Sequence, residues 1–263
     1  MLKKKLHKSY ATIPVIIRLY LKSFQIKKHI MMKRAVVLLV IMSLAYGISA
    51  GQTVKETRNV KGFTTVGFGI AGNLYVKIGP EFSVVLEGEE NDLEEVVTEL
   101  SGDRLQIKQE NWRFNFNEKV NVYITMPGLE GLGVSGSGRA EILDAVTDAD
   151  DLNLSVSGSG KLLTARLEVD ELDCSISGSG NIVIGSAGNA DRAEISISGS
   201  GGYSGEEFEI DHLDISVSGS GNCICKVGDS LEATISGSGN VTYIGDPKID
   251  ARVSGSGHVR AAK

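Results

Sequence analysis

Apolar and polar residues alternate along the C-terminal half of this 263-residue chain. From Leu213 to Cys225, every second position is Leu, Ile, Val, Gly or Cys, and the positions between them are almost all polar. The stretches 172–184 and 231–243 repeat this pattern. A period of two residues is typical of a β-strand with one buried face, so the pattern predicts strands rather than helices.

The alternating stretches are centred on a four-residue motif, Ser-Gly-Ser-Gly, which occurs seven times at intervals of 18–22 residues. A repeat of this length predicts stacked structural units, because one unit alone cannot bury its apolar face. We therefore predict an all-β, single-domain β-solenoid with coils of roughly 20 residues. We expect a parallel β-helix with a right-handed coil. The motifs begin at Ser135, Ser157, Ser177, Ser198, Ser218, Ser236 and Ser254.

The strand register predicts different roles for the glycines and the serines of the motif. Both glycines fall in the inward register, where a narrow bend would leave no room for a larger side chain. Both serines fall in the outward register and would stack into columns of hydroxyl groups. These columns are the candidate ligand surface, although serine is also simply a small residue that a bend tolerates. The candidates are Ser157, Ser159, Ser177, Ser179, Ser198, Ser200, Ser218 and Ser220.

The N-terminal 50 residues have the composition of an export signal. Residues 1–34 contain ten Lys or Arg and no acid, and residues 35–50 form an uncharged apolar stretch that ends in small residues. This order predicts a basic leader and a secretory signal peptide, cleaved after Ala50. Translation from Met31 or Met32, directly before Lys33 and Arg34, is the favoured start and keeps this signal peptide. The alternative is a long basic N-terminal region, or a cytoplasmic tail before an uncleaved anchor. We therefore expect the protein in the periplasm, on the outer membrane surface or outside the cell.

The rest of the chain divides by regularity. We expect residues 51–134 to form irregular N-terminal coils and a cap, and residues 135–263 to form the regular repeat coils of the same domain. Residues 66–76 resemble a repeat whose motif has changed to Gly-Ile-Ala-Gly. The segment 91–100 fits either a short helix or a strand. Strands are predicted at Phe82–Glu87, Arg104–Lys108 and Val120–Met126.

The charge of the chain argues against one class of partner, and its cysteines predict free thiols. After residue 50 the chain has 17 basic and 33 acidic side chains, an excess of acid that argues against binding nucleic acid. The three cysteines, Cys174, Cys223 and Cys225, cannot all pair within the chain. Cys223 and Cys225 lie two residues apart on one predicted strand, which is a poor geometry for a disulfide. We expect buried free thiols.

Catalytic chemistry is not indicated by the sequence. A catalytic serine needs a nearby base, and neither His212 nor His258 has an evident partner. The two histidines also lack a spacing that suits zinc. We therefore predict a non-enzymatic protein with no catalytic residues, no metal ligands and no cofactor.

Two features keep a carbohydrate-active or carbohydrate-binding solenoid open as the alternative. A dense acidic cluster near a predicted turn contains Asp144, Asp148, Asp150 and Asp151. An aromatic row, Trp112, Phe114 and Phe116, would share one face of a strand. A solvated turn and a packed core, respectively, also account for these residues. If the row is exposed, Trp112 is a candidate ligand-binding residue.

The last motif is followed only by residues 258–263, so the final coil would present an open edge. Charged residues often protect such edges, and Arg252, Arg260 and Lys263 are placed to do so. Pairing with a second subunit, giving a homo-oligomer, is the alternative.

Several segments together resemble one bacterial family. They are Gly62-Phe63, residues 69–76, the sequence Met126-Pro127-Gly128-Leu129 and the run of Gly-Ser-Gly motifs. The chain is similar, over about residues 58–260, to the auto-transporter adhesin family or head GIN domain, a domain of unknown function common in Bacteroidetes. The resemblance implies a solenoid shaped like pectin lyases, without their catalytic residues, and a role in adhesion. It implies no site residues.

We therefore predict an exported protein that presents a repetitive surface, either as an adhesin or as a cell-envelope binding protein. Its partner would be a glycan, a protein or an envelope component, and not nucleic acid.

Overall fold

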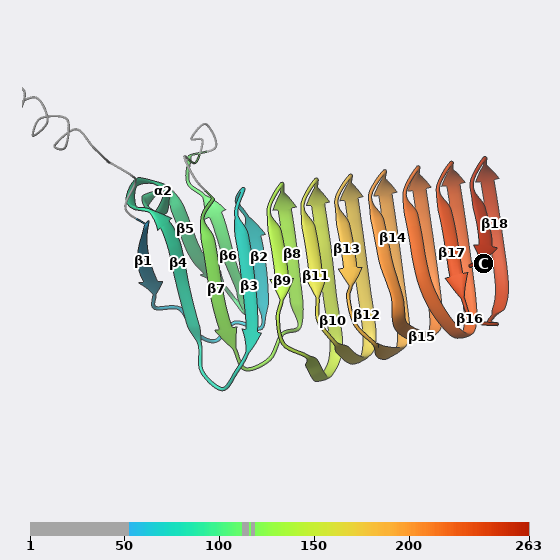
Figure 1. Cartoon of the computed structure of the whole chain (residues 1–263), viewed down its shortest axis with the longest axis horizontal. Helices are drawn as coiled ribbons and strands as arrows, with labels where there is room; N and C mark the ends of the chain where they lie inside the picture. The colour runs from blue at the N-terminus through green and yellow to red at the C-terminus, as the bar shows by residue number, and fades with distance from the viewer. Residues whose placement is uncertain (1–52, 112–115, 117–118, 263) are drawn as a thin grey trace, which may run out of the picture. The chain divides into compact units, whose positions relative to one another are not determined.

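The computed structural model describes residues 53–111, 116 and 119–262, and the structural statements below refer to these residues. The predicted leader, residues 1–50, lies outside them. Stacked parallel strands about 20 residues apart confirm the predicted β-solenoid, which has about 6 turns (Figure 1).

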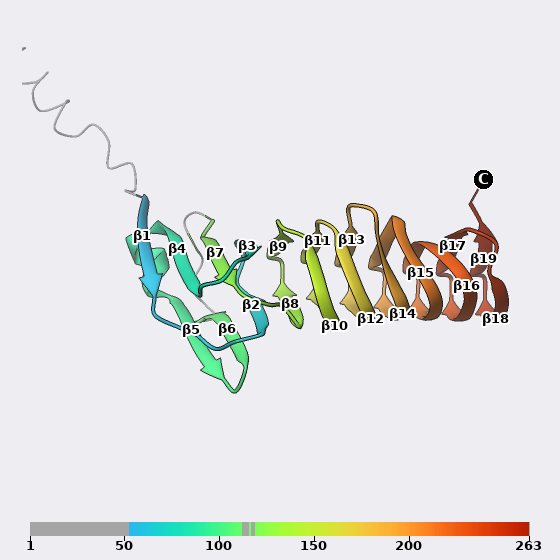
Figure 2. The ribbon, with the colours of Figure 1, turned by 90° about the horizontal axis from the view of Figure 1, so that it is seen from below.

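The coils of the solenoid have two walls, which Figure 2 shows as opposite layers seen along the strands. We call the wall whose strands lead into the Ser-Gly-Ser-Gly motif the motif wall. In order along the stack it contains β5 (Val96–Ser101), β6 (Arg104–Gln109), β2 (Thr65–Gly69), β8 (Gly131–Gly136), β10 (Val146–Gly158), β12 (Leu167–Gly178), β14 (Gly188–Gly199), the C-terminal parts of β15 (Gly202–Gly219) and β16 (Asn222–Gly237), and β18 (Lys248–Gly255).

The opposite wall, here the return wall, is formed by the strands that leave the motif. In order it contains β1 (Thr53–Arg58), β4 (Ser83–Glu89), β7 (Asn121–Met126), β3 (Asn73–Ile78), β9 (Arg139–Ile142), β11 (Lys161–Thr164), β13 (Asn181–Ile184), the N-terminal parts of β15 and β16, β17 (Asn240–Ile244) and β19 (His258–Ala261).

Equivalent residues of successive coils lie directly beside one another. Leu152 pairs with Leu172, Leu172 with Ala193, Ala193 with Leu213, and Leu213 with Leu231. All five are buried, as the alternation predicts. Over these residues the parallel pairing has no register shift, so each apolar column is continuous, and the columns form one core between the walls.

The N-terminal coils are stacked in an order that differs from their order in the sequence. The coil made of β2 and β3 lies between the β6–β7 coil and the β8–β9 coil, with parallel pairing on both sides. In this register Gly69-Ile70-Ala71-Gly72 occupies the place of a Ser-Gly-Ser-Gly motif. The strands β6 and β7 thus fold back beyond the first coil and cover it.

Antiparallel strands cap this end of the stack. β4 pairs with β7 and β1, and β5 pairs with β6, all antiparallel. The segment with two alternative predictions contains both elements, the short helix α2 (Glu90–Glu94) followed by strand β5. Leu93 of α2 is buried in the core, so the helix closes the end of the solenoid.

The motif forms the tight turn between the walls, and its two glycines have different roles. The second glycine is buried, as predicted, and a Cβ at Gly180 would lie 2.4 Å from Val156 Cγ1 and 2.6 Å from the Gly160 carbonyl oxygen. The prediction that the first glycine also faces inward is wrong. Gly178 is half-buried with φ of +113°, a left-handed conformation that takes it out of the strand alternation.

Hydrogen bonds between neighbouring turns explain why the first glycine is also closely approached. The Ser179 N–H donates to the Gly158 carbonyl at 2.8 Å, and the Ser200 N–H donates to the Gly178 carbonyl at 2.8 Å. A Cβ at Gly178 would lie 2.5 Å from that same Gly158 oxygen. The turn therefore requires glycine at the first position for two reasons, the positive φ and the lack of space for a Cβ atom.

The cysteines are free and buried, which confirms the sequence prediction. Cys174 lies on the motif wall, and Cys223 and Cys225 lie on the return wall. Burial raises the pKa of the Cys174 thiol and that of the Cys223 thiol well above the ordinary value. They therefore pack as small apolar side chains.

Candidate functional site

The outer surface of the motif wall carries aligned columns of hydroxyl groups. One column follows the first serine of the motif, and a second lies two residues earlier along each strand. Because the strands pair in register, successive side chains of a column are about 4.8 Å apart, and the columns are about 7 Å apart. We call this surface the hydroxyl face. Its residues are Ser155, Ser175, Ser196, Ser216 and Thr234 in one column, and Ser157, Ser177, Ser198, Ser218, Ser236 and Ser254 in the other.

All eight candidate serines named from the sequence are exposed. Four of them belong to the hydroxyl face. The other four, Ser159, Ser179, Ser200 and Ser220, lie on the turns and form a crest along the stack, where their backbone N–H groups bond the preceding turn. The structure therefore brings the candidates together as a regular array. Their role in binding remains a prediction.

A column of carboxylates borders the hydroxyl face, and the sequence analysis missed it. Each acid stands four residues before the first serine of a motif, so the signal was present in the repeat. All five acids are exposed. Like charges stacked on neighbouring strands repel, so this column favours a cationic or hydrogen-bond-donating partner. The column is Asp173, Glu194, Asp214, Glu232 and Asp250.

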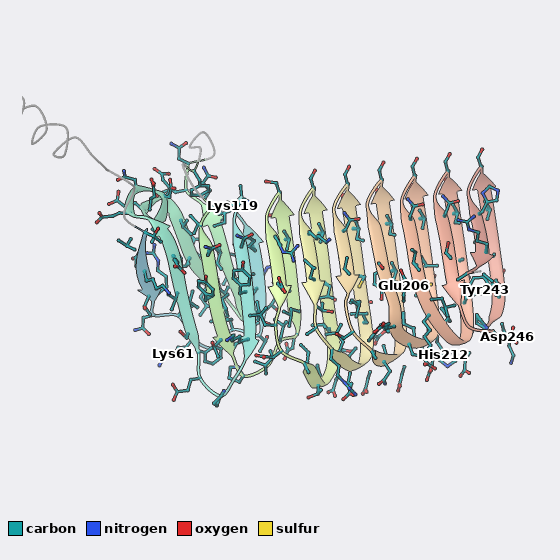
Figure 3. The ribbon with its side chains drawn as sticks, in the orientation of Figure 1. Lys61, Lys119, Glu206, His212, Tyr243 and Asp246 are labelled. Carbon is teal, nitrogen blue, oxygen red and sulfur yellow. The ribbon has the colours of Figure 1, made fainter. Side chains whose placement is uncertain are left out.

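A shallow hollow of about 590 Å³ lies over this column, and basic residues such as Arg192 and Lys248 share its lining. His212 is also in the lining, near the lower ends of the strands and away from the crest (Figure 3). Its Nδ1 lies 2.9 Å from Ser230 Oγ, a partner on the next coil that the sequence analysis did not find. Its Nε2 lies 4.0 Å from Asp229 Oδ2. The second distance exceeds hydrogen-bond range, so this arrangement falls short of a catalytic triad.

The predicted acidic cluster is divided between two roles. The Asp144 carboxylate accepts a hydrogen bond from the Ile78 N–H at 3.2 Å and so fixes the end of strand β3. Asp150 and Asp151 line a hollow of about 760 Å³ together with Glu130. The side chain of Asp148 lies outside the described residues.

The predicted aromatic row falls mostly outside the described residues, which include neither Trp112 nor Phe114. Phe116 is half-buried against the core, as a packing residue would be. A different aromatic pair lies on the outer surface of the return wall, where Tyr75 and Tyr123 stack with ring centroids 5.2 Å apart. Partial desolvation of its hydroxyl, and secondarily the neighbouring Glu87 carboxylate, raises the pKa of Tyr123. The shared outward position of the two tyrosines on paired strands was readable only once the pairing was known.

Within the described ranges, no three His, Cys, Asp or Glu side chains gather in a way that suits a metal ion. None of the described segments is a helix with the length and apolar character needed to span a bilayer.

Several solved structures share this fold. A protein from Bacteroides fragilis, described as a "putative adhesin", is 22% identical, with a TM-score of 0.76 over 82% of this chain and 100% of that one. A "putative adhesin" from Parabacteroides distasonis is 22% identical, with a TM-score of 0.68 over 81% and 98%. A "putative lipid binding protein" from the same species is 22% identical, with a TM-score of 0.63 over 81% and 98%. At this identity the likeness shows the fold alone.

Comparison with curated proteins gives no significant match. A family profile matches residues 62–247, which is more than half of the chain. The match includes the N-terminal coils and the first six Ser-Gly-Ser-Gly turns, so it covers the hydroxyl face almost entirely. The chain therefore belongs to the family described as "Putative auto-transporter adhesin, head GIN domain".

Proposed function

We propose that this chain is an exported, non-enzymatic solenoid that binds a glycan, a protein or another envelope component through the hydroxyl face. The observation that carries the proposal is the array itself. Hydroxyl groups, all exposed except the half-buried Ser155 and Ser196, stand in register over five to six successive coils, beside a column of carboxylates.

Physical features of the array suit it to contact an extended partner. Each hydroxyl both donates and accepts hydrogen bonds, and each carboxylate accepts them, so the face offers both kinds of group at a fixed spacing. The backbone beneath is held by parallel ladders on both sides, so binding does not have to order a flexible loop. Individual contacts are weak, but a repeating partner engages many of them at once.

Membership of the family and the names of two solved relatives support adhesion as the general role. Export is supported by the sequence of residues 1–50, with its basic start, apolar stretch and small-residue end.

The test is a binding assay with matched variants of the two walls. The motif-wall variant carries Ser177→Tyr, Ser198→Tyr and Ser218→Tyr, which cover the array with bulky rings at exposed positions. The control carries Lys161→Tyr, Asn181→Tyr and Asn222→Tyr, which are equally exposed on the return wall. Each is tested on glycan arrays, immobilised envelope fractions and intact cells.

The expected result is a loss of binding of at least about tenfold for the motif-wall variant and unchanged binding for the control, because each tyrosine displaces several contacts. Thermal unfolding shows that both variants remain folded. Equal losses in the two variants, or no binding by the original protein to any of these surfaces, would refute the proposal.

A second function is favoured by one observation, the hollow of about 760 Å³ that Asp150 and Asp151 line. If a polysaccharide is bound or cleaved there, Asp150→Asn removes that activity and the motif-wall variant keeps it. The reverse pattern assigns the function to the hydroxyl face.

A further inference from the structure

The last coil of the solenoid exposes residues that every other repeat coil buries. Ile249 and Val253 on β18 are 45% and 44% exposed, whereas the equivalent Leu231 and Ile235 of the preceding coil are 1% exposed. In the described part of the chain, β18 pairs only with β16 and β19 only with β17, so both outer edges are unpaired. Figure 1 shows β18 at this end of the stack. One additional coil would bury these side chains.

The opposite end of the stack differs. There the antiparallel strands β1 and β5 and the helix α2 close the core, and the inward residues Leu105 and Ile107 are fully buried. The unpaired edge with exposed core residues is therefore a property of the C-terminal coil.

We propose that a second copy of this chain covers the C-terminal coil, with β18 of the two copies paired antiparallel about a two-fold axis perpendicular to the walls. Such an axis keeps inward residues inward, so every inward residue must stand opposite another inward residue. The axis must therefore lie midway between the two copies of one residue of β18, so the number of possible registers is small. We name each register by that residue.

The sequence of β18 selects one of these registers. With the axis through Ala251, Asp250 stands opposite Arg252 of the partner subunit, and Ile249 stands opposite Val253 of the partner subunit. The two-fold symmetry produces each of these pairs two times in the dimer. Both charged pairs are then of opposite sign, and both apolar pairs continue the core columns.

Other registers lack this complementarity or pair less of the strand. An axis through Ile249 sets Lys248 opposite Asp250 of the partner subunit, but it pairs only residues 248–250 of β18, whereas the axis through Ala251 pairs residues 248–254. An axis through Asp250 places two copies of this acid together and sets Lys248 opposite Arg252 of the partner subunit. An axis through Arg252 places two arginines together. Like charges directly opposite one another destabilise a strand pair, so these registers are disfavoured.

The arrangement has a consequence for the surface. Rotation about an axis perpendicular to the walls leaves each motif wall on its own side. It also sets β19 antiparallel to its own copy. The hydroxyl faces of the two copies would therefore lie side by side and form one array of twice the length.

Cross-linking tests the register directly. Ala251→Cys places two thiols opposite each other on the axis. Opposite Cβ atoms of antiparallel strands are about 4.5–5.5 Å apart, so a small shift of the two strands brings them within the roughly 4.5 Å that a disulfide bridges. Ser254→Cys is the matched control, since it is equally exposed on β18 but stands opposite Lys248 of the partner subunit. The three native cysteines are buried and remain in both variants.

Light scattering during size-exclusion chromatography should show a dimer of the purified protein, and mild oxidation should convert Ala251→Cys, but not Ser254→Cys, into a covalent dimer. A monomer at all concentrations overturns the proposal. So does a dimer in which only Ser254→Cys cross-links.

Charge exchange provides the second measurement. Arg252→Asp turns two attractive pairs into two repulsive ones, so the dissociation constant of the dimer should rise by about tenfold. Adding Asp250→Arg restores opposite charges across the axis and should restore the dimer. Within its own chain Arg252 also donates to Asp250 at 3.0 Å and to Glu232 at 3.4 Å, so thermal unfolding of each variant is measured in parallel. Failure of the double variant to recover, with both variants folded, overturns the register.

Discussion

Replacing Gly219 by Ala tests the account of the Ser-Gly-Ser-Gly turn most directly. Gly219 has φ of +120°, and a Cβ there would lie 2.4 Å from the Gly199 carbonyl oxygen of the preceding coil. That distance is shorter than real Cβ atoms show, and the contacted atom belongs to the backbone, which cannot rotate away. The substitution therefore combines a steric conflict with a strained backbone.

Three other glycines separate the two contributions. Gly128→Ala meets nothing within 4 Å and should change the free energy of unfolding by less than about 0.5 kcal/mol. Gly102→Ala has a φ of +62° and open space, so it should cost about 1 kcal/mol for backbone strain alone. Gly221→Ala would lie 2.5 Å from Ile197 Cγ2 and 2.8 Å from the Gly201 oxygen, which should cost about 1–3 kcal/mol for overpacking.

Gly219→Ala should cost about 1 kcal/mol more than Gly221→Ala, or about 3 kcal/mol in total, because backbone strain adds to the steric conflict. In a domain of this size that cost lowers the melting temperature by about 6–12 °C. The assay is thermal unfolding of the four variants followed by far-UV circular dichroism. A melting temperature of Gly219→Ala equal to that of Gly128→Ala would show that the turn tolerates a side chain, and the account of the motif would be wrong.

Two further predictions concern the core. Tyr203 is buried, and its hydroxyl is one of the buried polar groups in the described residues that lack a hydrogen-bond partner. Tyr203→Phe should therefore stabilise the protein by about 1 kcal/mol, measured by chemical denaturation. A loss of stability would show that the hydroxyl has a partner. Burial raises the pKa of the Cys174 thiol and of the Cys223 thiol, so their reactive thiolate forms are scarce at pH 8 and become common only at higher pH. At pH 8 a thiol reagent should therefore modify them only after denaturation. Rapid modification of the folded protein at pH 8 would contradict their burial.

Much of the fold was predictable because the alternation and the repeat are local signals. Leu213, Ile215 and Val217 are buried, as their period of two requires, and the 18–22-residue interval gives the coil. The first motif serines, such as Ser177, are exposed for the same reason, whereas the second serines, such as Ser179, are exposed because they lie on the turns. The segment 91–100 was ambiguous because its apolar residues fit two periods, and the chain uses both in turn.

Other features depend on which strands lie side by side. The insertion of the β2–β3 coil between β6–β7 and β8–β9 joins residues that are distant in sequence, and no local pattern encodes such an order. The stacking of Tyr75 on Tyr123 follows from the pairing of β3 with β7. The contact of His212 with Ser230 follows from the pairing of β15 with β16.

The sequence by itself determined that the chain is a β-solenoid with serines facing outward, because a period-two pattern repeated at one interval has a single way to bury its apolar side. Only the tertiary structure decided the conformation of the first motif glycine. Its φ is set by the turn between two walls and by the carbonyl of the coil beneath, and neither exists until the coils are stacked. The same stacking turned separate serines and acids into aligned columns, and left Ile249 and Val253 exposed where the last coil has no neighbour.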